Sequence, residues 1–165
     1  MKKLLAFIMI ISTLLSLTAC KKDGKTDEPE LDITDFTVYT RAGEKVTLHE
    51  KFTGKPVVVN IWGKWCPYCV MELPDFEEAY LNNSDVEFMM INYGDEFAVS
   101  DEFLSDNGYT FPVYYDLSSN AVESYEVTGY PVTLFFAADG RLVKRYSGMI
   151  SAESLDMYIQ IIKDL

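Results

Sequence analysis

Two adjoining segments organise this chain: Pro56-Val-Val-Val-Asn-Ile-Trp62 and, after two more residues, Trp65-Cys66-Pro67-Tyr68-Cys69. The first is nearly continuously apolar, which is typical of a strand that is buried on both faces. The second opens a run with helical periodicity, because apolar positions recur at i, i+4, i+7 and i+11 in Cys69, Leu73, Phe76 and Tyr80. We therefore expect a buried strand that leads directly into a helix, with two cysteines at the junction.

The two cysteines have a definite chemistry at such a junction. A helix N-terminus carries unpaired N–H groups and partial positive charge, so Cys66 at this end would form a thiolate most easily. Cys69 lies about one turn further along, close enough to bond to Cys66 and less exposed. Pro67 suits the first turn, where no N–H is needed. Such a dithiol can attack a disulfide, hold a mixed disulfide and resolve it.

Two other interpretations of the pair are an inert crosslink and half of a zinc site. A bridge that closes so short a loop constrains the unfolded chain little, which disfavours a purely structural role. Zinc usually requires four nitrogen or sulfur ligands, but the chain offers no second cysteine pair and a single histidine, His49. We expect His49 to be a surface residue and predict no metal site.

Residues 1–19 are predicted to be a signal peptide. Lys2 and Lys3 form a positive start, and Leu4 to Leu17 is an apolar run that is short for a membrane span. The run ends in Leu17-Thr18-Ala19-Cys20, which resembles a bacterial lipobox. That resemblance implies cleavage before Cys20 and lipidation of this cysteine. Ordinary cleavage near Ala19, or an uncleaved anchor, is the alternative.

The rest of the chain divides into a tether and one domain. Residues 20–31 begin with the lipidated cysteine and continue as a polar segment that reads as a flexible tether, and residues 32–165 would form the domain. The formal net charge of −12 argues against nucleic-acid binding. Because residues 1–19 carry two lysines and no acidic residue, cleavage would change this charge to −14. The lipid, rather than electrostatic attraction, would then hold the domain at an anionic membrane.

The periodicity beyond the first strand predicts strands alternating with helices. Short strands at 36–40 and 45–48 would form an N-terminal hairpin, and further strands are expected at 56–62, 86–92, 111–115, 132–137 and 141–147. Helices are expected after the cysteine pair, over 97–107, over 118–126 and from 152 onward; Val99, Phe103 and Leu104 would form the apolar face of the second. The alternation implies parallel pairing early in the chain, whereas Asp139-Gly140 predicts an antiparallel hairpin. The fold class is therefore α/β, a mixed central sheet flanked by helices with an N-terminal hairpin extension.

These features together resemble the thioredoxin superfamily, and more narrowly its TlpA/ResA-like thiol–disulfide oxidoreductases in lipoprotein form. The resemblance covers about residues 32 to 165. It is carried by Val-Val-Val-Asn-Ile-Trp-Gly-Lys-Trp-Cys-Pro-Tyr-Cys, by Glu72-Leu73-Pro74, and by Gly129-Tyr130-Pro131 before Val-Thr-Leu-Phe-Phe. A thioredoxin-like fold is implied.

The resemblance also implies roles for individual residues. Cys66 would be the attacking thiol and Cys69 the resolving one. Pro131 would be cis and face the dithiol, and Tyr130 would line a backbone edge for the substrate. Asn60 stands where ordinary thioredoxins have an aspartate that assists proton transfer, a task that asparagine cannot perform.

Asp95 matches an acidic residue that follows the strand after the active-site helix in the ResA branch. A carboxylate near the cysteines raises thiol pKa values and can relay protons. A turn residue in Tyr93-Gly94-Asp95-Glu96 is an equally good interpretation.

Two positions depart from the family pattern. The Pro67-Tyr68 dipeptide, between Trp65-Cys66 and Cys69, is the one found in glutaredoxins. Tyr130 is bulkier than the usual neighbour of the cis-proline. Both positions affect redox potential and partner choice.

The sequence therefore predicts an extracytoplasmic, membrane-anchored lipoprotein that reduces disulfides of exported client proteins. Apocytochrome c and methionine sulfoxide reductase are client types that the resemblance implies, with a membrane thiol reductase as electron donor. No cofactor is expected besides the redox-active cysteine pair, and no nucleic acid is expected as a partner. Acidic side chains near the cysteine pair disfavour a thiolate on Cys66, and this favours a reductant over a strong oxidant.

Two alternatives stay open at this point. A disulfide-forming oxidase has the same fold, and Lys64, two residues before Cys66, would favour it by stabilising a thiolate. A Sco-like copper chaperone belongs to a different class of protein. It would require a Cys-x-x-x-Cys motif and a downstream histidine, neither of which the chain has.

Overall fold

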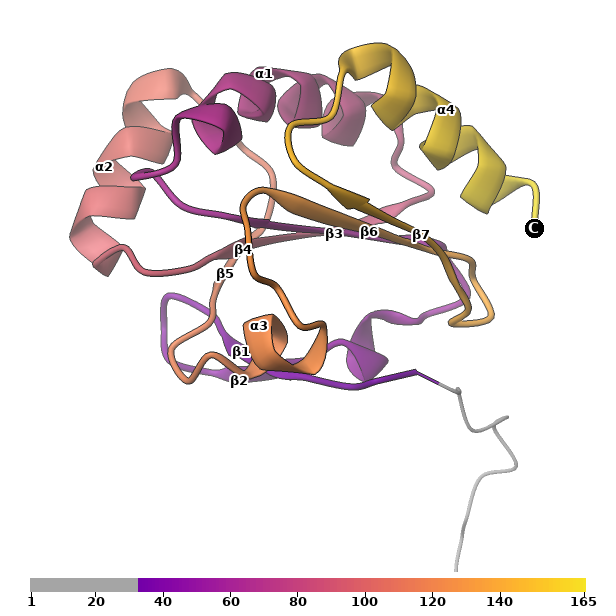
Figure 1. Ribbon diagram of the computed structural model, residues 1–165, viewed down its shortest axis with the longest axis horizontal. Coiled ribbons are helices and arrows are strands. Elements are labelled where there is room, and N and C mark those ends of the chain that lie inside the picture. The colour runs from indigo at the N-terminus through magenta and orange to yellow at the C-terminus, as the bar shows by residue number, and fades with distance from the viewer. Residues whose placement is uncertain (1–32) are drawn as a thin grey trace, which may run out of the picture.

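The computed structural model describes residues 33–165, which form a seven-stranded sheet in the order β2-β1-β5-β4-β3-β6-β7 (Figure 1). The strands are β1 (Thr37–Tyr39), β2 (Lys45–Thr47), β3 (Val57–Trp62), β4 (Glu87–Asn92), β5 (Val113–Tyr115), β6 (Val132–Phe136) and β7 (Leu142–Ser147). The helices are α1 (Pro67–Asn82), α2 (Phe97–Asn107), α3 (Asn120–Ser124), α4 (Ala152–Lys163) and a 3-10 turn, η1 (His49–Lys51).

The pairing of the strands makes the sheet mixed. Strand β3 is parallel to β4, and β4 is parallel to β5, as expected for strands joined by helices. Strand β3 is antiparallel to β6, β6 is antiparallel to β7, and the β1–β2 hairpin extends the opposite edge through β5. The predicted α/β class, thioredoxin-like sheet and N-terminal hairpin are confirmed.

The central position of β3 explains why its sequence is apolar at every residue except Asn60. Helices α1, α2 and α4 lie on one face of the sheet and α3 lies on the other (Figure 1). Val58 and Trp62 contribute to the core beneath α1, whereas Val57, Val59 and Ile61 contribute to the core on the α3 side. All six residues of β3 are buried, so both side-chain faces need apolar residues.

Two helices differ from their predicted form. In α2 the inward positions are Ser100, Phe103 and Leu104, while Val99 is exposed. The predicted apolar face was therefore right at Phe103 and Leu104 and wrong at its first position. Helix α3 begins later than predicted because the Asp116 carboxylate accepts the backbone N–H groups of residues 120 and 122 at its start. Glu126, with a φ of 48°, ends the helical region on the other side.

Some predictions lie outside the described residues, namely the signal peptide, the lipidated Cys20 and the tether. Within residues 33–165, none of the helices combines the length and apolar character needed to cross a bilayer.

Candidate active site

Cys66 and Cys69 form a disulfide at the start of α1. Cys66 is the N-cap residue, and its Sγ accepts the backbone N–H of Cys69 at 3.2 Å. Pro67 occupies the first helical position. Cys66 is 5% exposed and Cys69 is fully buried, so Cys66 is the sulfur that a partner reaches more easily. A thiolate on Cys66 would be stabilised by this N–H group and by the helix N-terminus.

The loop before β6 lies on the same side of the molecule. The Tyr130–Pro131 peptide is cis, as the family resemblance implies. Pairing of β6 with β3 places this loop beside the cysteines, and Tyr130 packs against the core cluster that contains both of them. The Pro131 carbonyl accepts the N–H of Gly148 at 2.8 Å. Within residues 33–165 the backbone N–H and C=O of Tyr130 form no backbone hydrogen bond, so they stay available to a partner.

A buried carboxyl group, Glu72, lies one turn after Cys69 on the inward face of α1. Its Oε1 accepts the Asn60 side-chain amide at 2.8 Å, and its Oε2 accepts the backbone N–H of Ile150 at 2.8 Å. Burial raises the pKa of Glu72 from 4.5 to about 7, although these two hydrogen bonds act in the opposite direction. Positions i and i+3 of a helix are neighbours on one face, and Cys69 and Glu72 are both buried on the inward face of α1.

Asn60 holds Glu72 rather than acting on protons itself. Its Nδ2 donates both to Glu72 and, at 3.1 Å, to the hydroxyl of Thr133 on the neighbouring strand β6. In the sequence, Glu72 stands in the family-like motif Glu72-Leu73-Pro74, which by itself indicates no role for its side chain. The signal that could have indicated a role was a charged residue, Glu72, on the apolar face of the predicted helix between Cys69 and Leu73.

Asp95 joins two loops at the edge of the site. Its Oδ2 accepts the backbone N–H of Lys64 at 2.6 Å and the side-chain amide of Asn92 at 2.7 Å. Asp95 thereby fastens the loop that carries Trp65 and Cys66 to the end of β4. These contacts give the carboxylate a structural task, and a proton-relay role for it stays a prediction.

The remaining predicted residues surround the disulfide with aromatic surface. Trp65 is 51% exposed and its indole N–H donates to the Tyr93 carbonyl at 2.8 Å. Tyr68, at the second position of α1, is 62% exposed. The Lys64 ammonium lies over the ring of Phe103, 6.0 Å from its centroid.

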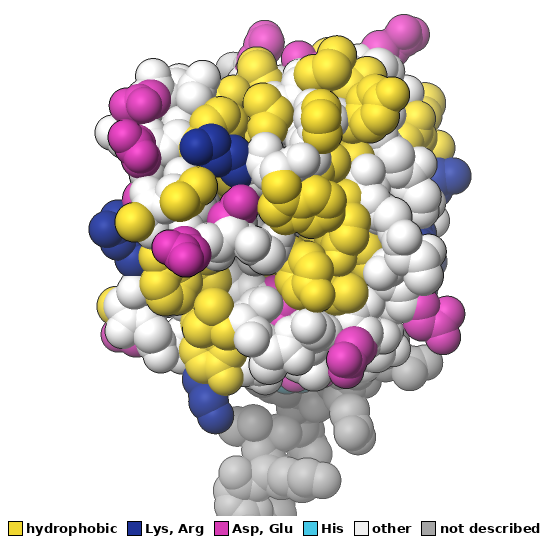
Figure 2. Space-filling model, turned by 60° about the vertical axis from the view of Figure 1, so that its left-hand side comes forward, with side chains coloured by type: hydrophobic (Ala, Val, Ile, Leu, Met, Phe, Trp, Pro, Cys, Tyr) yellow, Lys and Arg dark blue, Asp and Glu magenta, His cyan; other side chains and the backbone are white. Residues whose placement is uncertain are grey.

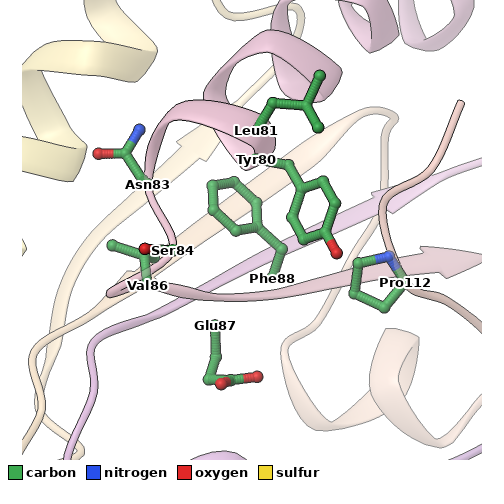
Figure 3. A pocket seen from close by; sticks show the side chains of 8 residues that line it. All are labelled: Tyr80, Leu81, Asn83, Ser84, Val86, Glu87, Phe88 and Pro112. Carbon is green, nitrogen blue, oxygen red and sulfur yellow. The ribbon is translucent and has the colours of Figure 1, made fainter.

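One further feature of the structure, a cavity, lies away from the disulfide. A cavity of about 380 Å³ lies at the opposite end of α1, where Tyr80 and Phe88 meet edge to face (Figure 3). None of the predicted site residues lines it.

In residues 33–165, no three His, Cys, Asp or Glu side chains are grouped so that they could hold a metal ion. His49 is exposed, in η1.

The fold and the disulfide at the start of α1 together define a thioredoxin-like thiol–disulfide oxidoreductase. The model of the AhpC/TSA family matches residues 30–145, and the chain belongs to this family. It is 28% identical over 131 residues to the thiol–disulfide oxidoreductase ResA of Halalkalibacterium halodurans, covering 78% of this chain and 74% of that protein.

Two solved structures show the same fold. StoA from Bacillus subtilis is 26% identical with a TM-score of 0.65, over 75% of this chain and 95% of that one. The exposed lipoprotein thioredoxin Etrx1 from Streptococcus pneumoniae is 26% identical with a TM-score of 0.64, over 79% of this chain and 99% of that one.

Proposed function

We propose that the protein is a membrane-tethered reductant of disulfides in exported client proteins. The observation that carries this proposal is the pairing of a disulfide at a helix N-terminus with a buried carboxyl group, Glu72, one turn beyond it. The first feature supplies a reactive dithiol once the pair is reduced. The second sets the direction in which that dithiol tends to transfer electrons.

The reaction follows from the order of the two cysteines. The Cys66 thiolate attacks one sulfur of the client disulfide, which breaks the client S–S bond and forms a mixed disulfide. Cys69 then loses its proton and attacks the sulfur of Cys66, so the client leaves as a dithiol that has gained two electrons and two protons. We assign Glu72 as the nearby base for the Cys69 proton, because its pKa of about 7 suits transfer near neutral pH.

The direction of electron flow follows from the charge near the pair. Strong oxidants of this fold are oxidants because their reduced form is stabilised. A carboxylate beside the cysteines disfavours the thiolate, and so works against that stabilisation. The Lys64 ammonium, which supported the oxidase alternative in the sequence, lies over the ring of Phe103. The buried carboxyl group supports the reductant.

The membrane location and the partners rest on the sequence and on similarity. The lipobox-like segment before Cys20 supports a lipid anchor, and the similarity to an exposed lipoprotein thioredoxin is consistent with it. We propose exported proteins of the apocytochrome c or methionine sulfoxide reductase type as clients, with a membrane thiol reductase as donor. Mass spectrometry of the mature chain tests the anchor: an acylated Cys20 at the N-terminus supports it, and an unmodified Cys20 refutes it.

Trapping of the mixed disulfide tests the client-reducing role. A full-length Cys69→Ser variant, expressed in its host, should accumulate covalent complexes with exported proteins that dithiothreitol releases. The matched Cys66→Ser variant retains the buried sulfur and should trap far less. Equal trapping by the two variants, or none by either, would contradict the assigned roles.

A further inference from the structure

Tyr93, which follows strand β4, connects three segments that border the disulfide. Its backbone N–H donates to the Trp62 carbonyl at 2.8 Å, at the end of β3. Its own carbonyl accepts the indole N–H of Trp65 at 2.8 Å. Its ring lies parallel to that of Tyr130, with centroids 5.7 Å apart and 8° between the planes. One residue therefore contacts the strand before the site, the loop of the site and the cis-proline loop.

Trp65 and Tyr130 also contact each other. Their rings meet edge to face with centroids 5.0 Å apart, a favourable arrangement for aromatic pairs. Trp65, Tyr93 and Tyr130 thus form a continuous aromatic wall. The hydroxyl of Tyr93 lies 3.3 Å from that of Ser119, which fixes the outer edge of the wall to the start of α3.

The wall is placed where a client would lie. Trp65 directly precedes Cys66, and Tyr130 packs against the core cluster of both cysteines while its backbone groups stay unpaired by the described backbone. An extended client segment that pairs with those groups would run along the three rings. Figure 2, which brings the α1 N-terminal side forward, shows hydrophobic side chains gathered over much of this face. Trp65 and Tyr68 are among the exposed hydrophobic residues of the chain.

We propose that Tyr93 is a positioning residue that builds this wall, and that the wall selects client segments with an apolar side chain beside their cysteine. The inference rests on the proposed reaction and adds its client preference. The three rings offer apolar surface and π faces and carry no formal charge at neutral pH. An apolar neighbour of the client cysteine is desolvated against them when the mixed disulfide forms, whereas a polar neighbour loses hydration without a partner.

Single-turnover reduction of two matched peptides tests this inference. The peptides carry one intramolecular disulfide and are identical except for Phe or Ser beside each cysteine. The reduced full chain is mixed with each peptide over a concentration range, which separates the half-saturating concentration from the maximal rate. For the unaltered chain we expect a half-saturating concentration about tenfold lower for the Phe peptide, with similar maximal rates. No preference for the Phe peptide would refute the inference.

Variants at position 93 then assign the preference to the wall. Tyr93→Ala should lower the preference to about twofold or less, since it removes the stacked ring, and Tyr93→Phe should retain it. Tyr80→Ala is the matched control, because Tyr80 is a half-buried aromatic residue at the far end of α1 and should leave the preference intact. A preference that survives Tyr93→Ala, or that is lost equally in Tyr80→Ala, would contradict the proposal.

Two safeguards keep the outcome decisive. If Tyr93→Ala does not fold, as judged by circular dichroism, Tyr130→Val removes the same ring pair from the exposed side and should abolish the preference in its place. Reduction of 2-hydroxyethyl disulfide by the unaltered chain tests the proposed reaction independently. Failure there would refute the reductant itself, whereas success there with equal use of both peptides would refute the wall alone.

Discussion

Replacement of Glu72 by glutamine should change how the stability of the oxidised protein depends on pH. Burial raises the pKa of Glu72 from 4.5 to about 7, so the folded state binds this proton more tightly than the unfolded state does. The raised pKa stabilises the folded state fully at a pH below 4.5, where the carboxyl group is protonated in both the folded and the unfolded state. This stabilisation is lost as the pH rises from 4.5 through 7. Each tenfold change in proton affinity corresponds to about 1.4 kcal/mol, which gives a loss of about 3 kcal/mol by pH 8.

Glutamine is a matched neutral replacement at this position. Its carbonyl oxygen can accept the N–H of Ile150, and its amide can donate to the Asn60 Oδ1, which has no partner in the described structure. The Glu72→Gln chain should therefore fold without the ionisation cost. Glu78→Gln is the control, because Glu78 lies on the same helix and is exposed.

Urea unfolding of the three proteins at about pH 5 and about pH 8 measures the effect. The free energy of unfolding of Glu72→Gln relative to the unaltered chain should rise by about 2.5 kcal/mol between the two pH values, because a smaller part of the effect is already present at about pH 5. The Glu78→Gln difference should stay constant, and the comparison cancels every group that the variants share. If the Glu72→Gln difference changed by less than about 0.5 kcal/mol, a buried carboxyl group with a raised pKa could not be at this position.

Three further substitutions test the surroundings of the disulfide. Gly63→Ala should displace the indole of Trp65, because an added Cβ would overlap the Nε1 atom of that ring. The free energy of unfolding in urea should fall by about 1–3 kcal/mol and the tryptophan emission should shift. Unchanged emission would contradict this packing. Asp95→Ala should lower the free energy of unfolding by about 1–2 kcal/mol, since the Lys64 N–H and the Asn92 amide lose a charged acceptor; a loss under about 0.5 kcal/mol would show that the clamp is weak. Asn60→Ala should raise the pKa of Glu72 further by removing a hydrogen bond to its carboxylate, and a downward shift of the pH range in which stability falls would refute this.

The sequence predicted those elements whose structure is determined by residues that are close together in the chain. The apolar run of β3 indicated a strand buried on both faces, and the cysteine spacing after it indicated a pair at the start of a helix. Both conclusions depend on local periodicity and on the chemistry of helix ends, which a single segment carries.

Contacts between segments that are far apart in the chain could not be predicted from the sequence. Glu72 meets Ile150 across 78 residues, and only the packing of α1 against the start of α4 makes its carboxyl group a buried one. The stacking of Tyr93 on Tyr130 joins the ends of two strands that are not adjacent in the sheet. The inward face of α2 failed for a related reason, because tertiary packing selected Ser100 over the more hydrophobic Val99.

The reduction potential of the Cys66–Cys69 pair tests the reductant assignment most directly. The full chain is equilibrated in glutathione and in dithiothreitol buffers of known potential, and the fraction of free thiol is measured after acid quenching. The account predicts a reversible two-electron titration with a midpoint near that of thioredoxin, about −270 mV. A midpoint near −120 mV would contradict it and make the protein a donor of disulfides.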